Sequence, residues 1–179
     1  MTKQIADLEF EILLTADKIE ERIKAIGIQL NEDYNNSIPV FIGVLSGSFL
    51  FTADLIKQVG IPCEINFTKL ASYYGGVSST LKIREDIDLT VDIRGRDVLI
   101  IEDIVDTGNT AHYLIQKLKE REPASLRLCS LLLKPAALQK KIEELKYVGF
   151  EIENEFVVGY GLDYKEMGRN LKDIYKKVG

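Results

Sequence analysis

The sequence predicts an α/β fold in which a central, mostly parallel β-sheet is flanked by helices. Continuous apolar runs at residues 39–45 and 98–101 are typical of strands that are buried on both faces, as in a parallel sheet. Strand-like runs alternate with helical patterns through the middle of the chain, which is the order expected of parallel strands joined by crossover helices. A ligand crevice is therefore expected at the carboxyl ends of these strands.

Two helices are predicted before residue 60. The first begins after Thr15, because apolar side chains then recur at helical spacing. The second covers residues 49–59 and ends at Gly60. The apolar stripe of the first helix consists of Ile19, Ile23, Ile26 and Leu30.

Residues 61–73 are predicted to form a strand with one wet face. Apolar and polar side chains alternate there, which places Ile65 and Phe67 on the side facing the core. The following residues, 74–80, contain two adjacent glycines and predict a mobile loop. This loop forms most of a flexible segment that we place at about residues 71–82.

The rest of the chain continues the alternation of strands and helices. Its predicted elements are a short strand from Leu81, buried strands over residues 98–101, 126–133 and 156–158, a helix over 110–120 and a helix opened by Pro135. With 179 residues, the whole chain is expected to form one domain.

The composition excludes several function classes. A formal net charge of −5 argues against a basic nucleic-acid binder, and no apolar run is long enough to cross a membrane. The N-terminal stretch carries acidic residues and is not a signal peptide, so a cytoplasmic protein is expected. Cys63 and Cys129 are expected to be core thiols, and with His112 as the only histidine a zinc site is not expected.

The segment VLIIEDIVDTGNT, at residues 98–110, carries the chemistry. An apolar strand leads into two acidic residues, then into a loop at the start of a helix, where backbone N–H groups and the helix dipole attract an anion. The loop lacks the lysine of a nucleoside-triphosphate P-loop, so a phosphate monoester is the expected ligand. It consists of Asp106, Thr107, Gly108, Asn109 and Thr110.

Three carboxylates stand in or beside this loop. Glu102 and Asp103 could accept hydrogen bonds from the hydroxyls of a sugar phosphate and could assist a Mg²⁺ ion. Asp106 is unusual beside a phosphate, and either caps the helix or faces a reacting base. The structural alternative is an ordinary strand–helix turn in which the neighbouring acids are solvated.

Together with further matches between Phe41 and Arg169, this segment resembles the purine phosphoribosyltransferases, and in particular their hypoxanthine(-guanine) members. The resemblance implies a type I phosphoribosyltransferase fold, with a small hood built from the terminal segments. It implies Mg²⁺-dependent transfer of ribose 5-phosphate from phosphoribosyl pyrophosphate (PRPP) to a 6-oxopurine base, which releases pyrophosphate and gives IMP or GMP. It also implies a homodimer or homotetramer that binds neither nucleic acid nor membranes.

The resemblance assigns roles to residues in order along the chain. Ser46 and Gly47 resemble the pyrophosphate loop, in which many relatives have lysine at the position of Ser46 and which often contains a cis peptide. Ser72 and Tyr73 resemble the pair on the flexible loop that closes over the reaction centre. Lys134 resembles the lysine that donates to the purine 6-oxo group, although on local grounds it fits a solvent-reaching lysine at a helix start equally well.

The C-terminal third matches the purine pocket. The resemblance implies that Phe156 stacks on the purine, the Val157 backbone reads its edge and Arg169 binds pyrophosphate. It makes Asp163 a third carboxylate that assists Mg²⁺, with Glu102 and Asp103, and makes Asp106 the general base that takes the proton from purine N7.

Two other functions stay open at the level of sequence. The same fold can host a regulator that senses PRPP or a nucleotide and binds nucleic acid, without catalysis. A transferase that prefers xanthine or guanine would also fit, because backbone contacts in the pocket decide that choice.

Overall fold

A computed structural model of the chain describes residues 2–74 and 81–179, with the backbone alone at residues 71–74 and 81–86. Its main feature is a six-stranded sheet with strand order β5-β4-β3-β6-β7-β8, in which only the β4–β5 pairing is antiparallel. The predicted mostly parallel sheet is therefore confirmed. The strands are β3 (Val40–Leu45), β4 (Glu64–Tyr74), β5 (Leu81–Ile87), β6 (Asp97–Val105), β7 (Ser125–Leu133) and β8 (Leu145–Glu151).

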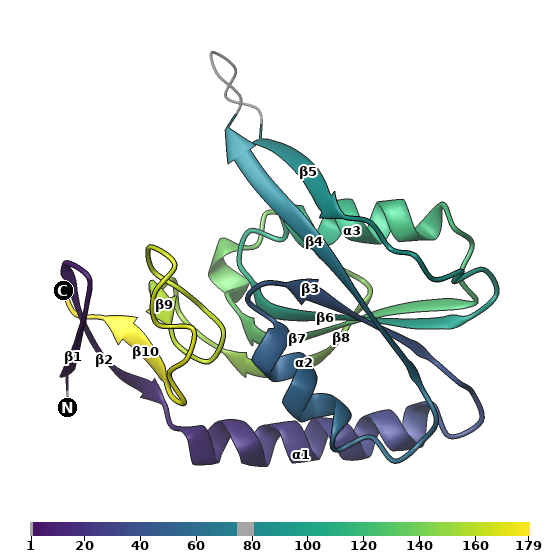
Figure 1. The fold of residues 1–179 in the computed structure, drawn as a ribbon, viewed down its shortest axis with the longest axis horizontal. Coiled ribbons are helices and arrows are strands. Elements are labelled where there is room, and N and C mark those ends of the chain that lie inside the picture. Colours follow the sequence, from purple (N-terminus) through teal and green to yellow (C-terminus); the bar gives the residue numbers. More distant parts are fainter. Residues whose placement is uncertain (1, 75–80) are drawn as a thin grey trace.

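Continuous apolar sequence explains why the central strands are buried on both faces. In β6, Leu99 packs in the cluster that contains helix α1 (Ala16–Asp33) and helix α2 (Phe49–Ile56), whereas Ile100 packs in the cluster that contains helix α3 (Asn109–Lys119). Figure 1 shows α1 and α2 on one side of the sheet and α3 on the other. Successive side chains of a strand point to opposite faces, so a strand between two helical layers needs apolar residues at every position.

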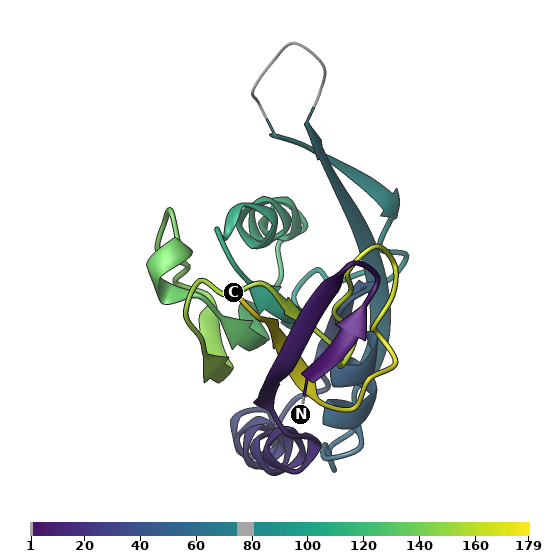
Figure 2. The ribbon, with the colours of Figure 1, turned by 90° about the vertical axis from the view of Figure 1, so that its left-hand side faces the viewer.

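The terminal segments form a second, antiparallel sheet, which we call the hood. Its strands run in the order β1 (Thr2–Ile5), β2 (Leu8–Leu14), β10 (Ile174–Lys177) and β9 (Val157–Val158). The turned view in Figure 2 brings this sheet to the front of the molecule. Val157 and Ile174 of the hood are buried in the same cluster as helix α1, so the hood and the main sheet share apolar packing.

The prediction that Ile65 and Phe67 of strand β4 face the core is wrong. Ile65 and Phe67 are 41% and 38% exposed, whereas Thr68 on the other face is buried and its hydroxyl donates to the Ile87 carbonyl at 2.9 Å. Helix α2 ends at Ile56 instead of reaching residue 59, and this face of β4 stays partly open to solvent. The opposite face of β4 is the covered one, because the chain after β5 packs there.

Pro135 opens a helical turn as predicted, but not an extended helix. Only a three-residue 3₁₀ turn, Pro135–Ala137, forms. The chain then leaves helical geometry, because the Gln139 N–H donates to the Thr107 carbonyl at 3.1 Å and holds this segment against the loop before α3. Strand β8 and the hood strands β1, β2 and β10 have no counterpart among the predicted elements.

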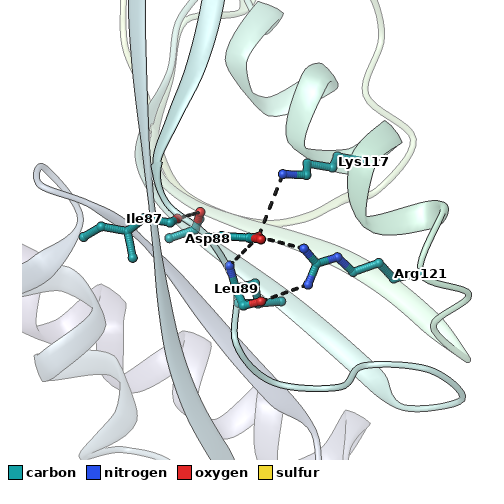
Figure 3. A network of polar contacts seen from close by, with 6 residues as sticks. Ile87, Asp88, Leu89, Lys117 and Arg121 are labelled. Atoms are coloured by element: carbon teal, nitrogen blue, oxygen red, sulfur yellow. Dashed lines mark hydrogen bonds and ion pairs between the residues drawn. The ribbon is translucent and has the colours of Figure 1, made fainter.

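A polar network fastens the end of β5 to helix α3 (Figure 3). Asp88 Oδ1 accepts hydrogen bonds from Arg121 Nη2 and from the Leu89 N–H, both at 2.7 Å. Arg121 Nη1 donates to the Leu89 carbonyl at 3.0 Å, and Lys117 Nζ lies 3.9 Å from Asp88 Oδ1. The base of the β4–β5 hairpin is thus tied to the helix whose first turn borders the cavity described below. Among the described residues, no helix is both long and apolar enough to span a membrane.

Strands β7 and β8 pack so closely at Gly149 that we expect any side chain there to destabilise the fold. A Cβ atom there would overlap the Leu131 carbonyl oxygen, which is backbone and cannot move aside easily. We expect Gly149→Ala to cost about 2 kcal/mol and to lower Tm by about 5 °C in a thermal melt. Gly60→Ala is the matched control, because the nearest atom to its new methyl group would be Asn31 Oδ1 at 3.8 Å. Equal Tm values for the two variants would contradict this packing.

Candidate active site

A cavity of about 370 Å³ lies at the carboxyl ends of β3 and β6. It is the crevice that the parallel sheet predicts, and residues from four parts of the chain surround it. Its polar lining consists of Ser46, Gly47, Glu102, Asp103, Asp106, Thr107, Gly108, Asn109, Thr110, Asp163 and Arg169. The structure therefore brings the predicted loop, acid pair and pyrophosphate residues to one cavity.

The loop before α3 has the geometry of an anion-binding site. Gly108 directly precedes the helix with φ +82°, a left-handed conformation that suits glycine. The His112 N–H donates to the Gly108 carbonyl at 2.9 Å and the Asn109 N–H to Thr107 Oγ1 at 3.4 Å, so the chain turns tightly into the helix. The first N–H groups of a helix have no acceptors within the helix, and here they border the cavity.

The acid pair lies in the last part of strand β6, before the loop. Glu102 is 6% exposed, and burial together with the neighbouring Asp103 charge raises its pKa well above the usual range. Burial raises the pKa of Asp103 to about 6, although its carboxylate accepts a hydrogen bond from the Ile104 N–H at 3.0 Å. The cavity wall therefore carries acidic groups that a bound cation would stabilise in their charged form.

Two glycines allow the loops to approach Asp103. A Cβ atom on Gly47 would overlap the Asp103 carboxylate, and one on Gly161 would overlap the Gly47 carbonyl oxygen. The peptide bond between Leu45 and Ser46 is cis. The loop after β3 is thus packed between the acid pair on one side and the segment after β9 on the other.

Asp163 and Arg169 form an ion pair at the cavity. Arg169 Nη2 lies 2.8 Å from Asp163 Oδ1, while Arg169 Nη1 donates to the Gly161 carbonyl at 2.8 Å. The second oxygen of Asp163 accepts a hydrogen bond from the Glu166 N–H at 2.9 Å. Both side chains are about a quarter exposed, so they remain accessible from the cavity.

Asp106 is paired with Lys134. Lys134 Nζ donates to Asp106 Oδ2 at 2.8 Å, and the lysine side chain is 8% exposed while that of Asp106 is 46% exposed. A buried ammonium needs such a partner, because an unpaired charge would be costly in this environment. Lys134 is therefore not the solvent-reaching lysine of the local alternative, although the Asp106 side chain remains open to solvent.

The remaining predicted site residues lie away from this cavity or cannot be placed. Phe156 is 45% exposed and makes an edge-to-face contact with Tyr164, and Val157 is buried in the hood. Ser72 and Tyr73 lie on strand β4, where only the backbone is described, and the predicted mobile loop extends into residues 75–80, outside the described residues.

Other contacts, at the cavity and in the segment after β9, were not anticipated. Leu70 of β4 lines it, and Glu166 Oε2 lies 3.4 Å from Arg169 Nη2. Tyr160 donates from its hydroxyl to Asp54 Oδ2 of helix α2 at 2.6 Å. The unusual run Gly159-Tyr160-Gly161 is the one signal in the sequence that points to a special backbone at this place.

The carboxylates do not form a closed metal site by themselves. Within residues 2–74 and 81–179 as described, no three acidic, histidine or cysteine side chains gather closely enough to hold a metal ion. Oxygen ligands from one or two carboxylates, completed by ligand oxygens and water, are nevertheless the usual environment of Mg²⁺. Glu102, Asp103 and Asp163 could supply such oxygens to an ion that a phosphate ligand also holds.

Comparisons with known proteins agree with this geometry. Residues 10–165 match the family model described as the phosphoribosyl transferase domain. The hypoxanthine-guanine phosphoribosyltransferase of Streptococcus pneumoniae R6 is 46% identical over 164 residues, which cover 92% of this chain and 91% of that protein. The hypoxanthine phosphoribosyltransferase of Salmonella typhimurium is 43% identical over 170 residues, which cover 94% of this chain and 95% of that protein.

Solved structures agree on the fold. The crystal structure of a hypoxanthine phosphoribosyltransferase from Staphylococcus aureus superposes with a TM-score of 0.88 at 43% identity, covering 94% of this chain and 91% of that one. A Trypanosoma cruzi hypoxanthine phosphoribosyltransferase superposes with a TM-score of 0.87 at 38% identity, covering 93% and 94%. The expected type I phosphoribosyltransferase fold, with its hood, is confirmed. Sequence, fold and cavity together establish that the chain belongs to the phosphoribosyl transferase family.

Proposed function

We propose that this chain catalyses the Mg²⁺-dependent transfer of ribose 5-phosphate from PRPP to hypoxanthine and guanine, forming IMP or GMP and releasing pyrophosphate. The observation that carries the proposal is that one cavity joins a helix N-terminus, an acid pair and Asp106, which is itself paired with Lys134. The relatives that bear the names of hypoxanthine and hypoxanthine-guanine phosphoribosyltransferases support it.

Each end of PRPP has a candidate partner in the cavity. The first turn of α3 would bind the 5-phosphate, and the ribose hydroxyls would face Glu102 and Asp103. Ser46, Gly47 and Arg169 would bind the pyrophosphate end. Mg²⁺, when bound, would neutralise the leaving pyrophosphate, with oxygen ligands from the substrate and from the carboxylates Glu102, Asp103 and Asp163.

The Asp106–Lys134 pair is complementary to the edge of a 6-oxopurine. In such a base the 6-oxo acceptor and N7–H are neighbours, and here an ammonium donor lies 2.8 Å from a carboxylate acceptor. Lys134 would donate to the 6-oxo group, and Asp106 would take the N7 proton as the bond from C1 to the base forms. As the bond from C1 to pyrophosphate breaks, the nearby carboxylates would stabilise the positive charge on the ribose.

Phe156, Val157, Ser72 and Tyr73 complete the proposed site. Phe156 would stack on the purine, and its exposed ring leaves a face available for this contact. The Val157 backbone would read the purine edge. Ser72 and Tyr73, at the end of strand β4, would belong to a flexible segment, at about residues 71–82, that excludes water from the reaction.

The direct test is incubation with PRPP, Mg²⁺ and each of hypoxanthine, guanine, xanthine and adenine, followed by chromatographic detection of nucleoside monophosphates. We expect IMP and GMP. A chain that binds PRPP but forms no nucleotide would instead be a sensor, and dominant formation of XMP would move the substrate preference to xanthine.

We further propose that all 179 residues act as one domain and that the protein assembles as a homodimer or homotetramer in the cytoplasm. Three exposed apolar side chains, Phe49, Ile65 and Phe67, support a protein interface near α2 and β4. Cys129 is buried as expected of a core thiol, whereas Cys63 is only partly buried. Light scattering measures the assembly, and a monomer would contradict it.

Asp106→Asn tests the proposed general base. The amide retains the oxygen that accepts from Lys134 but cannot take a proton, so we expect kcat to fall by about 100-fold or more. The Kd for PRPP, measured by calorimetry, should change by less than about twofold. Equal turnover by the variant and the wild type would remove Asp106 from the mechanism.

Lys134→Ala tests recognition of the 6-oxo group. Without the ammonium donor, we expect the ratio of kcat/KM for hypoxanthine to that for adenine to fall by at least about tenfold. The experiment compares both bases with the same enzyme preparation. An unchanged ratio would contradict the role given to Lys134.

Asp103→Asn tests whether the acid pair is kept at the expense of stability. Below pH 3.8, the ordinary pKa of Asp103, the carboxyl is protonated in both the folded and the unfolded chain and does not affect the free energy of unfolding. As the pH rises to about 6, the pKa of Asp103 in the folded chain, the unfolded chain loses this proton first, so the free energy of unfolding falls. Without Mg²⁺ near pH 7, the variant should therefore melt a few degrees higher than the wild type, while losing activity. Near pH 4 the difference in Tm should largely vanish, and a lower Tm at both pH values would refute this explanation.

A further inference from the structure

The turn at residues 159–161 is tied to helix α2 by one side-chain hydrogen bond. The Tyr160 hydroxyl donates to Asp54 Oδ2 at 2.6 Å, across 106 residues of sequence. The Tyr160 residue is buried, and burial together with the Asp54 carboxylate raises the pKa of its phenol. The hydroxyl therefore stays protonated, and remains a donor, at any physiological pH.

Tyr160 has a backbone conformation that a tyrosine disfavours. Its φ is +49°, between Gly159 at +104° and Gly161 at +99°. The Tyr160 N–H donates to the Leu171 carbonyl at 2.9 Å, and the Gly161 N–H to the Arg169 carbonyl at 2.9 Å. Contacts of the side chain and the backbone thus hold the turn in a shape that the residue would not adopt alone.

This turn contacts both groups proposed to bind pyrophosphate. Gly161 lies so close to the Gly47 carbonyl that a Cβ atom would overlap it. Its own carbonyl accepts the hydrogen bond from Arg169 Nη1 at 2.8 Å, and Arg169 is paired with Asp163. A shift of the turn would therefore move Arg169 relative to Gly47.

Helix α2 also connects Asp54 to the loop that contains Gly47. It begins at Phe49, whose N–H donates to the Ser46 carbonyl at 3.3 Å, directly after the loop that contains Gly47. These contacts form a closed ring. It runs from Gly47 along helix α2 to Asp54, across the hydrogen bond to Tyr160, and through Gly161 back to Gly47. The Tyr160–Asp54 hydrogen bond is the link that closes this ring.

We infer that Tyr160 and Asp54 are positioning residues, which fix Gly47 and Arg169 at the spacing needed to bind the pyrophosphate group of PRPP. The inference rests on the proposed function. Neither residue lines the cavity, so the effect reaches the ligand through Gly47, Gly161 and Arg169.

Tyr160→Phe removes one oxygen atom and tests the inference. We expect the Kd for PRPP, measured by calorimetry with Mg²⁺ on the whole chain, to rise about five- to tenfold, with a matching rise in KM for PRPP. The value of kcat and the KM for hypoxanthine should change by less than about twofold, because neither proton transfer nor base contacts involve Tyr160.

Tyr147→Phe is the matched control. It also removes a tyrosine hydroxyl that donates to an aspartate, Asp33, in a cluster beside Arg127 that does not line the cavity. We expect a loss of Tm similar to that of Tyr160→Phe with an unchanged Kd for PRPP. An equal rise in Kd for the two variants would mean that general stability controls binding, and would overturn the inference.

Asp54→Ala provides a second route to the same hydrogen bond if Tyr160→Phe folds poorly. It should raise the Kd for PRPP as Tyr160→Phe does, and the double variant should bind no more weakly than the weaker single variant. A wild-type Kd for PRPP in either folded single variant would overturn the inference. If the wild type itself neither binds PRPP nor forms nucleotide, the proposed function fails instead.

Discussion

Two adjacent carboxylates at the end of strand β6, of which Glu102 is buried and Asp103 partly buried, constrain the architecture around the cavity. Both side chains line the cavity, and their raised pKa values express the free-energy cost of holding negative charge there without a bound cation. Neighbouring segments can approach this pair only where they lack side chains, which explains Gly47 against Asp103 and Gly161 against Gly47. The positive charge of Arg169 partly offsets the acidic wall.

The fold makes such a costly arrangement possible. The sheet is apolar on both faces and packs against helices on either side, so its burial supplies the stability that the carboxylates reduce. The hood shares the α1 side of this core and brings Asp163 and Arg169 to the cavity from the far end of the chain. Polar groups that are distant in sequence thus meet at the carboxyl edge of a rigid sheet, where a ligand can be held by several loops at once.

The sequence predicted those features that have a strong local signal. Continuous apolar runs predicted the parallel strands. The acid pair followed by Asp106–Thr110 predicted the loop that lines the cavity. Features that depend on tertiary packing were not predictable in this way. The covered face of β4 was assigned wrongly because alternation along a strand shows which side chains share a face but not which face is covered. The helix from Pro135 is only a short 3₁₀ turn because the Gln139 N–H donates to the Thr107 carbonyl. The hood strands pair the two ends of the chain, which no local pattern reveals.

A crystal structure of the protein with IMP would test the role of the loop after strand β6. If that loop holds the sugar phosphate, the phosphate group will accept hydrogen bonds from backbone N–H groups of residues 107–110, and the ribose hydroxyls will lie against Glu102 and Asp103. A nucleotide whose phosphate lies outside this cavity, with the first turn of α3 still facing solvent, would contradict the assignment of this site.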